Sequence, residues 1–475
     1  MILTENGKEF KVDLQKIERN IYDMCMAIGR AQMAEILTEL DEQIFSQRDV
    51  KEYKSEGQRK TSLKTIMGEV EYSRRVYWTR DESGGKEYTY LLDNALGIDA
   101  PGKMSELVSS LIATAACESD YREVAEKISE TSGLKISHTT AWSVTQAVGS
   151  RVLGYEEQLA EKAVQNKGTG QLESKVLFEE QDGVWLSLQG KARKEHGKSK
   201  EMKVAIAYTG ISETAGGRRN LSDKVACASF ESASEFVERK EGHIASVYNV
   251  DEIEMRILNG DGAKWIKGQK GADTVYQLDI FHRNKAIREY VNDPDLCSLM
   301  MDLLLNKRID DLLDVIEASI NSTVDETEQK RRKALLSYFS NNKDALIPYH
   351  ERGLEIPDVN PGLQRAPLGA MESNIFTMVG NRMKGRRASW SIDGANHLAA
   401  LICLKQTGRL KRTLSVIGEV IPTTSLHAIT GFSSAKTQQA VGKGYNGFKR
   451  AEIPNMKWSK SLLGMRALSN IRFGS

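Results

Sequence analysis

The sequence predicts an α/β fold whose strands end on acidic residues. Two short apolar runs, at residues 255–258 and 274–278, are followed by Asp261 and Asp279. The segment between the runs is long enough for one helix and a turn, so the order is strand, helix, strand. In such sheets, groups that bind ligands collect beyond the carboxyl ends of the strands. Asp261 therefore stands where a ligating carboxylate is expected.

Length and composition are those of an ordinary globular protein. The chain has 475 residues, of which 40% are hydrophobic and 28% charged, so about two to four domains are expected. No apolar run approaches the length of a membrane span, and the first residues lack a secretory signal pattern. The five cysteines are scattered singly without zinc-ligand spacing. These features predict a cytoplasmic protein without a membrane partner.

The net charge of +1 hides a basic C-terminal region. Lys and Arg predominate from residue 381 onward, where the acidic residues are Asp393, Glu419 and Glu452. Residues 405–475 are expected to form a largely irregular basic tail. Such a tail suggests a polyanionic partner, although a solvated surface balanced elsewhere in the fold remains an alternative.

The N-terminal third predicts helices and one small sheet. Residues 1–54 have apolar positions at helical spacing and no proline, which predicts a helical region. Residues 55–100 contain EVEYSRRVYW, whose alternation predicts a small β-hairpin, and EYTYLL is a candidate third strand.

Residues 101–167 predict a helical DNA-binding region. One helix, at 121–131, ends at a Ser-Gly turn, and a second begins at the favourable N-cap Ser137. Two short helices joined by such a turn are typical of a helix-turn-helix, whose second helix enters the major groove. We therefore expect DNA contacts from the start of that helix and its next turn, at His138, Thr139, Thr140, Ser143 and Gln146. Any helical hairpin gives the same pattern, so this alternative stays open.

Residues 168–292 predict the first part of an α/β core. After a linker-like stretch at 168–175, KVLFEEQDGVWLSLQG, MKVAIAYTGI and KVACASF predict three strands, and SASEFVERKEGHIASVYN predicts a helix. Followed by the strand-helix-strand unit, this is the order of a ribonuclease H-like core. The Asp182-Gly183 pair inside the first strand also suits a hairpin turn, which is the alternative for that position.

The core is expected to resume after a helical insertion. Residues 293–360 predict two or three helices, with a break near 321–326. Residues 361–404 predict a helix that bears Glu372 at the border of an apolar stripe formed by Met371, Ile375, Met378 and Val379. The same helix continues into four basic residues, for which we expect DNA contacts: Arg382, Lys384, Arg386 and Arg387.

Three carboxylates are candidates for one metal site: Asp182, Asp261 and Glu372. In this core the first and fourth strands lie side by side, and a helix packed across the sheet brings Glu372 to the same point. Converging carboxylates repel one another unless a cation neutralises them, and oxygen ligands favour Mg²⁺ or Mn²⁺. Two such ions would support phosphoryl transfer. Singly, Asp261 could instead cap a helix and Glu372 could be an ordinary surface residue.

Other residues near these positions are candidates for supporting roles. Asp279 and His282 form a D-x-x-H pair after the fifth strand, in which the imidazole could donate to a phosphate or orient a carboxylate. A half-buried structural histidine is the alternative. Trp265 and Trp390 are expected in the core, with a platform for a nucleic-acid base as the alternative.

The segments QDGVWLSLQ, GDGAKWI, LDIFHRNK and ESNIFTMVGNRMKGRRASWSIDGANHLAAL together resemble insertion-sequence transposases of the ISLre type, and distantly the Mutator-like group. The resemblance implies a DDE transposase with Asp182, Asp261 and Glu372 as metal ligands and Asp279 and His282 as an accessory pair. It also implies double-stranded DNA as partner, a homodimer or higher oligomer on DNA, and a place at the bacterial nucleoid. The alternatives are a ribonuclease H-like nuclease without strand transfer and a catalytically inactive DNA-binding protein.

Overall fold

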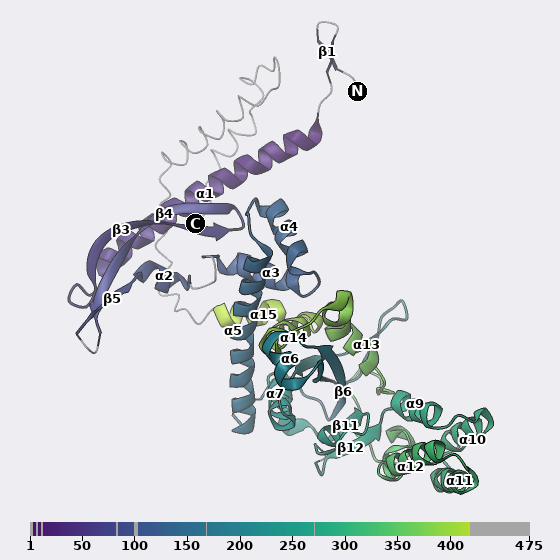
Figure 1. Ribbon diagram of the computed structural model, residues 1–475. Coiled ribbons are helices and arrows are strands. Elements are labelled where there is room, and N and C mark those ends of the chain that lie inside the picture. Colours follow the sequence, from purple (N-terminus) through teal and green to yellow (C-terminus); the bar gives the residue numbers. More distant parts are fainter. Residues whose placement is uncertain are drawn as a thin grey trace.

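The computed structural model describes residues 3–418, except 6–7, 11–12, 82–83, 99–102, 168 and 270. The molecule is elongated, with an N-terminal part of helices and a small sheet, a central α/β core, and a layer of helices beyond that core (Figure 1). The long helix α5 (His138–Val164) runs from the N-terminal part to the core. Within the described ranges, no helix has the length and apolar character needed to cross a membrane.

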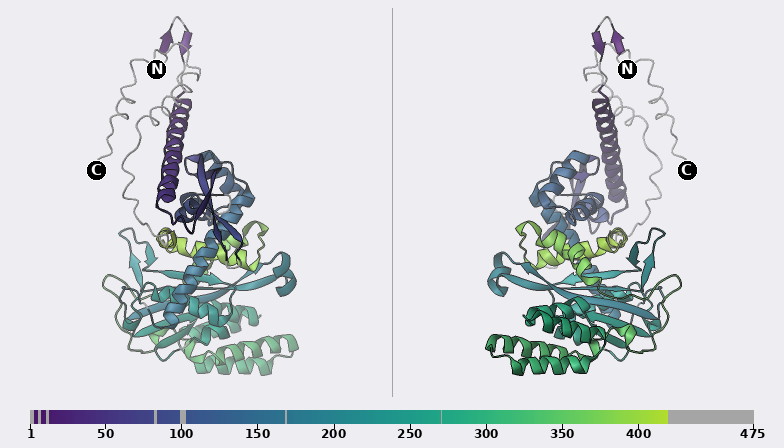
Figure 2. Two further views of the ribbon diagram at one scale, coloured as in Figure 1. Left: turned by 90° about the vertical axis from the view of Figure 1, so that its left-hand side faces the viewer. Right: turned by 90° about the vertical axis from the view of Figure 1, so that its right-hand side faces the viewer.

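The N-terminal part is built on α1 (Leu14–Gln47), which projects away from the core in Figure 2. Its C-terminal half packs on an antiparallel sheet through a cluster that includes Leu37 and Val70. The strands, in spatial order, are β3 (Lys54–Thr65), β4 (Gly68–Arg80) and β5 (Lys86–Thr89). The hairpin and the candidate third strand are therefore confirmed.

The first residues of the chain differ from the expected helix. Two short antiparallel strands, β1 (Leu3–Glu5) and β2 (Lys8–Phe10), precede α1. The prediction of helix from residue 1 is wrong there because the apolar helical spacing begins only at Leu14. The Asn-Gly pair in the sequence between the two strands is itself a signal for a hairpin.

The predicted pair of helices at 121–131 and 137 onward is confirmed as a pair. It follows α2 (Leu91–Leu96) and α3 (Glu106–Ala116) and consists of α4 (Tyr121–Ser132) and α5. Gly133 ends α4 with a left-handed φ of 69°, and the Ser137 hydroxyl accepts a hydrogen bond from the amide of Thr140 at the start of α5. Helix α5 is 27 residues long. Beyond its first turns it packs against two helices of the core, α7 (Ala233–Ala245) and α14 (Ile392–Gln406).

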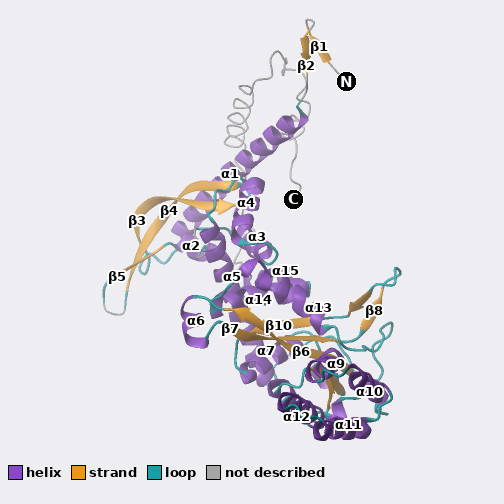
Figure 3. Ribbon diagram, turned by 45° about the vertical axis from the view of Figure 1, so that its right-hand side comes forward, coloured by secondary structure: helices purple, strands orange, loops and turns teal. Residues whose placement is uncertain are grey.

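The core sheet has the spatial order β10-β7-β6-β11-β12. Its strands are β6 (Val176–Ser187), β7 (Ser199–Tyr208), β10 (Val225–Ser229), β11 (Met255–Gly260) and β12 (Thr274–Leu278). The first three strands are antiparallel, whereas β11 runs parallel to both β6 and β12. The expected neighbourhood of the first and fourth strands is thus confirmed, and the sheet lies between helices (Figure 3).

Strand β6 continues through Asp182 and Gly183, so the hairpin turn considered for this pair is wrong. Gly183 is paired with Lys203 of β7. A Cβ atom on Gly183 would lie 1.9 Å from Oε1 of Glu201. The flexible side chain of Glu201, rather than a turn, occupies the space beside Gly183.

The stretch at 169–175, which the sequence suggests is a linker, is packed onto the core. The amide of Gly170 donates to the carbonyl of Tyr248 at 2.9 Å, and Leu172 pairs with the same residue in an isolated bridge. The small residue is needed because a Cβ on Gly170 would lie 2.0 Å from the backbone of Val247.

Helices cover both faces of the sheet. Helix α7 (Ala233–Ala245) packs on the face that carries Leu177 and Ala207. The opposite face, with Phe178 and Ile206, packs on the late helices. These are α13 (Met371–Ile375), which continues as a π-helix (Phe376–Lys384), then α14 (Ile392–Gln406) and α15 (Leu410–Gly418). Shorter elements at the sheet margins are α6 (Gly190–His196), α8 (Lys264–Lys267), β8 (Ile211–Glu213) and β9 (Arg219–Leu221).

The helical insertion is confirmed as three helices with their own apolar core. They are α10 (Pro294–Leu305), α11 (Ile309–Ser322) and α12 (Glu326–Ser340), preceded by α9 (Ile280–Tyr290). The expected break falls between α11 and α12. Their buried residues join Leu258 and Leu278 of the core sheet, so the insertion is fixed to the edge that carries β11 and β12.

The prediction of an irregular tail from residue 405 is wrong for the first residues of that region, because α14 runs to Gln406 and α15 follows. Helix α15 buries Leu410 and Leu414 in the main core. Residues 419–475, the rest of the predicted basic tail, lie outside the described residues.

Candidate active site

The predicted acidic residues line one pocket beside the carboxyl ends of the parallel strands. Asp182 stands two residues beyond Glu180, the last residue of β6 that pairs with β11, and Asp261 follows β11 directly. Glu372 reaches the same pocket from the first turn of α13. The residues that line the pocket are Gln181, Asp182, Asn259, Asp261, Asp279, Phe281, His282, Gly369, Met371 and Glu372. The structure therefore brings together all five residues predicted for catalytic or accessory roles.

Asp182 is held by contacts on both carboxylate oxygens. One oxygen accepts a hydrogen bond from the amide of Gly183 at 2.7 Å, and the other lies 3.3 Å from Nε2 of His282. The hydrogen bond with Asp182 raises the pKa of His282, although partial burial opposes that rise. His282 therefore contacts a candidate metal ligand directly.

Asp279 has a structural position at the base of the pocket. It is buried and forms the N-cap of α9, with one oxygen accepting from the amide of His282 at 3.0 Å. The other oxygen accepts from the side-chain amide of Asn259 at 2.9 Å. The D-x-x-H pair thus places the imidazole by capping the helix that carries it.

Asp261 is supported by the helical insertion. Its Oδ1 accepts a hydrogen bond from the amide of Ala263 at 2.8 Å, and its carbonyl accepts one from the hydroxyl of Tyr338 on α12 at 2.6 Å. Gly262 has a left-handed φ of 93°, and a Cβ there would lie 2.9 Å from the Tyr338 ring. Burial raises the pKa of Asp261, and the negative charge of Asp182 adds to the rise.

Glu372 differs from the two aspartates because its side chain is exposed. Its neighbour Met371 is buried in the main core and fixes the start of α13. As the side chains stand, no three His, Cys, Asp or Glu residues within the described part of the chain are grouped closely enough to hold a metal ion. An ion shared by the three carboxylates would therefore require side-chain rotation, for which exposed Glu372 has the most room.

Three further polar residues near the pocket were missed by sequence reasoning. Glu180 and Asn259 are almost completely buried and precede Asp182 and Asp261 by two positions. Glu180 lies on the same face of β6 as Asp182, whereas Asp261 directly follows β11. Two consecutive glutamates, Glu179 and Glu180, directly after the apolar residues VLF of a predicted core strand are a signal in the sequence. Glu201 of β7 is half-buried; burial raises its pKa, and Asp261 and Asp182 add to that rise.

The residues predicted to read DNA have different environments. His138 and Thr139 are exposed at the start of α5, whereas Thr140 shares a hydrogen bond with the Ser137 hydroxyl. Gln146, on the next turns, faces the core, where its Oε1 lies 2.8 Å from Nδ1 of His397. The exposed start of α5 is therefore available to a ligand, but Gln146 is not.

The predicted basic cluster after Glu372 is also divided. Arg382 donates from Nε to the carbonyl of Ala116 at 2.8 Å, and its guanidinium lies over the rings of Tyr121 and Trp390. Lys384 and Arg387 are exposed, and the side chain of Arg386 lies outside the described residues.

Both tryptophans have the core positions expected as their default. Trp390 is buried and donates to the carbonyl of Met383 at 2.9 Å. Trp265 packs edge-on against Phe236, with ring centroids 5.5 Å apart.

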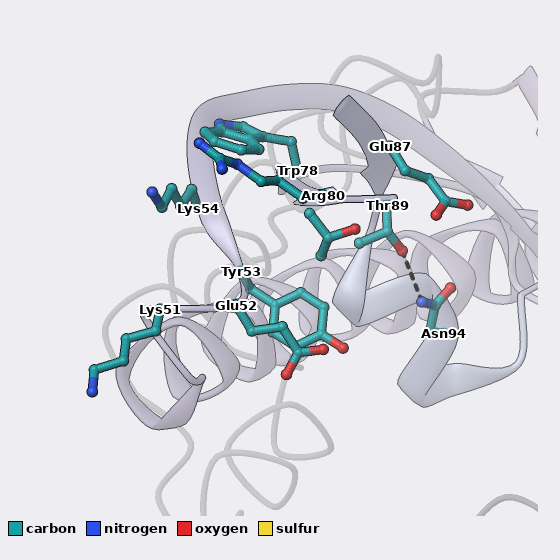
Figure 4. Close-up of a pocket in the computed structure, with 10 residues that line it drawn as sticks. Lys51, Glu52, Tyr53, Lys54, Trp78, Arg80, Glu87, Thr89 and Asn94 are labelled. Atoms are coloured by element: carbon teal, nitrogen blue, oxygen red, sulfur yellow. Dashed lines mark hydrogen bonds between the residues drawn. The ribbon is translucent and has the colours of Figure 1, made fainter. Parts of the chain in front are cut away.

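A second hollow lies far from the carboxylates, on the N-terminal sheet (Figure 4). It is bounded by Trp78 and Arg80 of β4, by Lys54 of β3, and by Thr89, which accepts a hydrogen bond from Asn94 at 2.9 Å. Glu52 and Glu87 also line it, so its walls carry charges of both signs. This mixed lining does not define a site for an anion.

The fold and the pocket define a mixed α/β protein with an acidic pocket beside two parallel strands of its central sheet. The chain belongs to the uncharacterised protein family UPF0236, whose model matches residues 4–417. The UPF0236 protein in vanSb 3'region of Streptococcus gallolyticus is 23% identical over 432 residues, which cover 86% of each chain. A UPF0236 protein of Caldanaerobacter subterraneus subsp. tengcongensis is 24% identical over 415 residues, which cover 86% of this chain and 80% of the relative. Its name joins eleven locus designations.

Proposed function

We propose that this protein is the DNA transposase of an insertion sequence. It cleaves DNA at the element ends and joins the freed 3′-hydroxyls to target DNA through a DDE carboxylate site. The observation that carries the proposal is the convergence of Asp182, Asp261 and Glu372, which come from three distant segments, on one pocket. The strand order and the parallel pairing of β6 with β11 are those expected of a ribonuclease H-like core, which supports the same reading.

The donor set of the pocket fits Mg²⁺ or Mn²⁺. The ligands would be carboxylate oxygens of Asp182, Asp261 and Glu372, which hard divalent cations prefer. When bound, such ions neutralise the charge of the scissile phosphate and activate the attacking oxygen. His282 orients Asp182 through their contact, and Tyr338 holds the backbone of Asp261. The contribution of the protein is thus to position charge, which is the main requirement of phosphoryl transfer.

Contacts with DNA are proposed for two exposed regions. The start of α5, with His138 and Thr139, would enter a groove as the second helix of a helix-turn-helix. Lys384 and Arg387 would contact phosphates near the pocket, joined by the basic residues of the tail. Two element ends require two protomers, so we expect a homodimer or higher oligomer on DNA at the bacterial nucleoid.

The name of one relative is consistent with a mobile element. The UPF0236 protein of Caldanaerobacter subterraneus carries eleven locus designations in a single name, and another from the same strain carries four. A gene that is copied from site to site produces this kind of repetition. For this chain, the matching observation would be short inverted repeats bounded by direct repeats around its gene.

The proposal is tested by DNA cleavage and joining with the wild-type chain and four variants. The substrate is DNA carrying the element ends, with Mg²⁺. Asp182→Asn, Asp261→Asn and Glu372→Gln should each reduce cleavage by about 1,000-fold, since each removes charge from the site, while DNA affinity is retained. Asp358→Asn, at a surface carboxylate outside the pocket, is the matched control and should retain activity.

The outcomes separate the alternatives. Strand transfer at the wild-type rate in any of the three pocket variants refutes the site. Cleavage by the wild-type chain without joining identifies a nuclease instead of a transposase. DNA binding without any cleavage identifies an inactive DNA-binding protein.

A further inference from the structure

Glu180 is a buried carboxylate that the proposed chemistry does not use. Its side chain is 0% exposed and lies on β6, on the same face as Asp182. Its Oε1 accepts from the hydroxyl of Tyr208 at 2.7 Å and from the amide of Ala370 at 3.2 Å. Its Oε2 accepts from the amide of Gly369 at 2.8 Å and from the side-chain amide of Asn259 at 3.2 Å. All four partners present donor groups, so both oxygens of Glu180 accept hydrogen bonds.

Glu180 and its hydrogen-bond partners lie on or next to all three elements that carry the pocket carboxylates. Glu180 itself precedes Asp182 by two positions on β6, and Asn259 precedes Asp261 by two positions on β11. Gly369 and Ala370 lie immediately before Met371 and Glu372 at the start of α13. A single buried side chain therefore connects the strand ends to the helix that bears Glu372.

The helix α13 has no capping side chain of its own, so contacts from elsewhere in the chain hold its start. Its N-cap is Ala370, which cannot accept a hydrogen bond from the first amides of the helix. Glu180 accepts hydrogen bonds from the amides of Gly369 and Ala370, the two residues before the helix, from a position 189 and 190 residues earlier in the chain. It therefore holds the backbone at the point where α13 begins.

The same network extends to the accessory pair. Asn259 donates to Asp279 as well as to Glu180, and Asp279 caps the helix whose His282 contacts Asp182. The chain of contacts thus returns to the strand on which it began. Displacement of any one member would be transmitted to the others.

We propose that Glu180 is a positioning residue, which holds α13 and therefore Glu372 against the strand ends that carry Asp182 and Asp261. The consequence for metal binding rests on the proposed function, whereas the placement of α13 does not. Glu180 is not itself a ligand, because both of its oxygens are occupied by buried donors.

The test replaces Glu180 by glutamine, which keeps the shape of the side chain but turns one acceptor into a donor. Either the Gly369 and Asn259 pair or the Ala370 and Tyr208 pair then faces an NH₂ group. The matched control is Glu156→Gln. Glu156 is also a buried carboxylate, bound to Arg239 at 3.0 Å and to His243 at 3.2 Å, but it joins α5 to α7 and touches none of the pocket elements.

Two measurements on the full chain are needed. In the first, Mn²⁺ binding is followed by electron paramagnetic resonance. Glu180→Gln should weaken it by about 10- to 100-fold, as is usual for residues that support metal ligands, while Glu156→Gln should bind like the wild type. In the second, hydrogen exchange without metal should be faster at residues 369–375 in Glu180→Gln only. Wild-type Mn²⁺ affinity together with wild-type exchange in a folded Glu180→Gln variant overturns the inference.

The two proposals fail in distinguishable ways. If the wild-type chain does not bind Mn²⁺, the metal site fails, while the exchange measurement still decides the role of Glu180. If Glu180→Gln does not fold, Ala370→Pro replaces it. Proline removes the Ala370 amide hydrogen and suits the φ of −79° at that position. Unchanged Mn²⁺ affinity and unchanged exchange in Ala370→Pro would then overturn the inference.

Discussion

Replacing Arg382 by methionine should reduce stability, whereas replacing Lys384, two residues later, should reduce DNA affinity. The two basic residues lie on the same π-helix and look equivalent in sequence. Arg382 is turned toward the protein, where it donates to the carbonyl of Ala116 and lies over two aromatic rings. Lys384 is exposed.

The expected loss for Arg382→Met follows from its contacts. A hydrogen bond from a charged donor contributes roughly 1.5 to 3 kcal/mol. Each contact of the guanidinium with an aromatic ring, here at 5.4 and 5.6 Å from the centroids, adds roughly 0.5 to 1 kcal/mol. Methionine regains part of this by packing, which leaves a loss of about 2 to 4 kcal/mol. For a domain of roughly 150 to 250 residues, that loss lowers the unfolding temperature by roughly 5 to 15 °C.

The assay compares thermal unfolding with the salt dependence of DNA binding. Lys384→Met should unfold at the wild-type temperature but reduce the slope of log affinity against log salt by about 0.9, the value for one phosphate contact. Arg382→Met should show the reverse. An unchanged unfolding temperature with a reduced slope in Arg382→Met would show that this side chain faces DNA and that the reasoning is wrong.

Three further changes have definite expected results. Burial would raise the pKa of Glu241, but Lys240 and Arg256 lower it from 4.5 to about 2. The contribution of the Glu241 carboxylate to stability is therefore complete above pH 4.5 and is lost as the pH falls toward 2. Glu241→Gln should flatten the acid side of the stability curve, and an unchanged acid side would count against the ion pairs. Deleting residues 419–475 should leave the unfolding temperature unchanged and reduce the slope of log DNA affinity against log salt. Deletion from residue 405 also removes buried Leu410 and Leu414 and should lower the unfolding temperature. Equal unfolding temperatures of the two deletion variants would contradict the role of α15. Gly183→Ala should cost about 1 kcal/mol in urea unfolding, because its methyl would lie 1.9 Å from Oε1 of Glu201 and that side chain must move. Glu201→Ala in the same chain should recover most of this loss; no recovery would place the strain elsewhere.

Much of the secondary structure could be predicted because its signals are local. The alternation in EVEYSRRVYW, the Ser137 cap and the apolar spacing of the insertion each act within a few residues of the chain. Local position also predicts Asp261 and Glu372 as candidates, since Asp261 directly follows a strand and Glu372 lies in the first turn of a helix, whereas Asp182 lies inside β6. Two of the predictions that were wrong are the helix before Leu14 and the linker at 169–175. In both places a short local pattern differs from the longer helical or linker pattern around it.

The roles of individual polar side chains could not be predicted in the same way. Arg382 and Lys384 differ only in which side of one helix faces the protein, and that depends on where α3 packs. Glu180 and Asp182 lie on one strand and one face, yet the first is buried beneath Gly369 and the second lines the pocket. The members of each pair lie only two residues apart in the chain, so spacing in the sequence does not distinguish their environments.

The sequence by itself determined the order of the elements, the acidic character of the strand ends and the basic character of the C-terminal region. These depend on residue type and on periodicities of two and about four residues. The sequence predicts the neighbourhood of β6 and β11 and the shared pocket only by analogy with a ribonuclease H-like core, and the tertiary structure shows both directly. Only the tertiary structure decided that Glu180 binds the amide of Gly369, 189 positions away. Contacts at such separations are fixed by the packing of the whole core, and no local pattern in the chain encodes them.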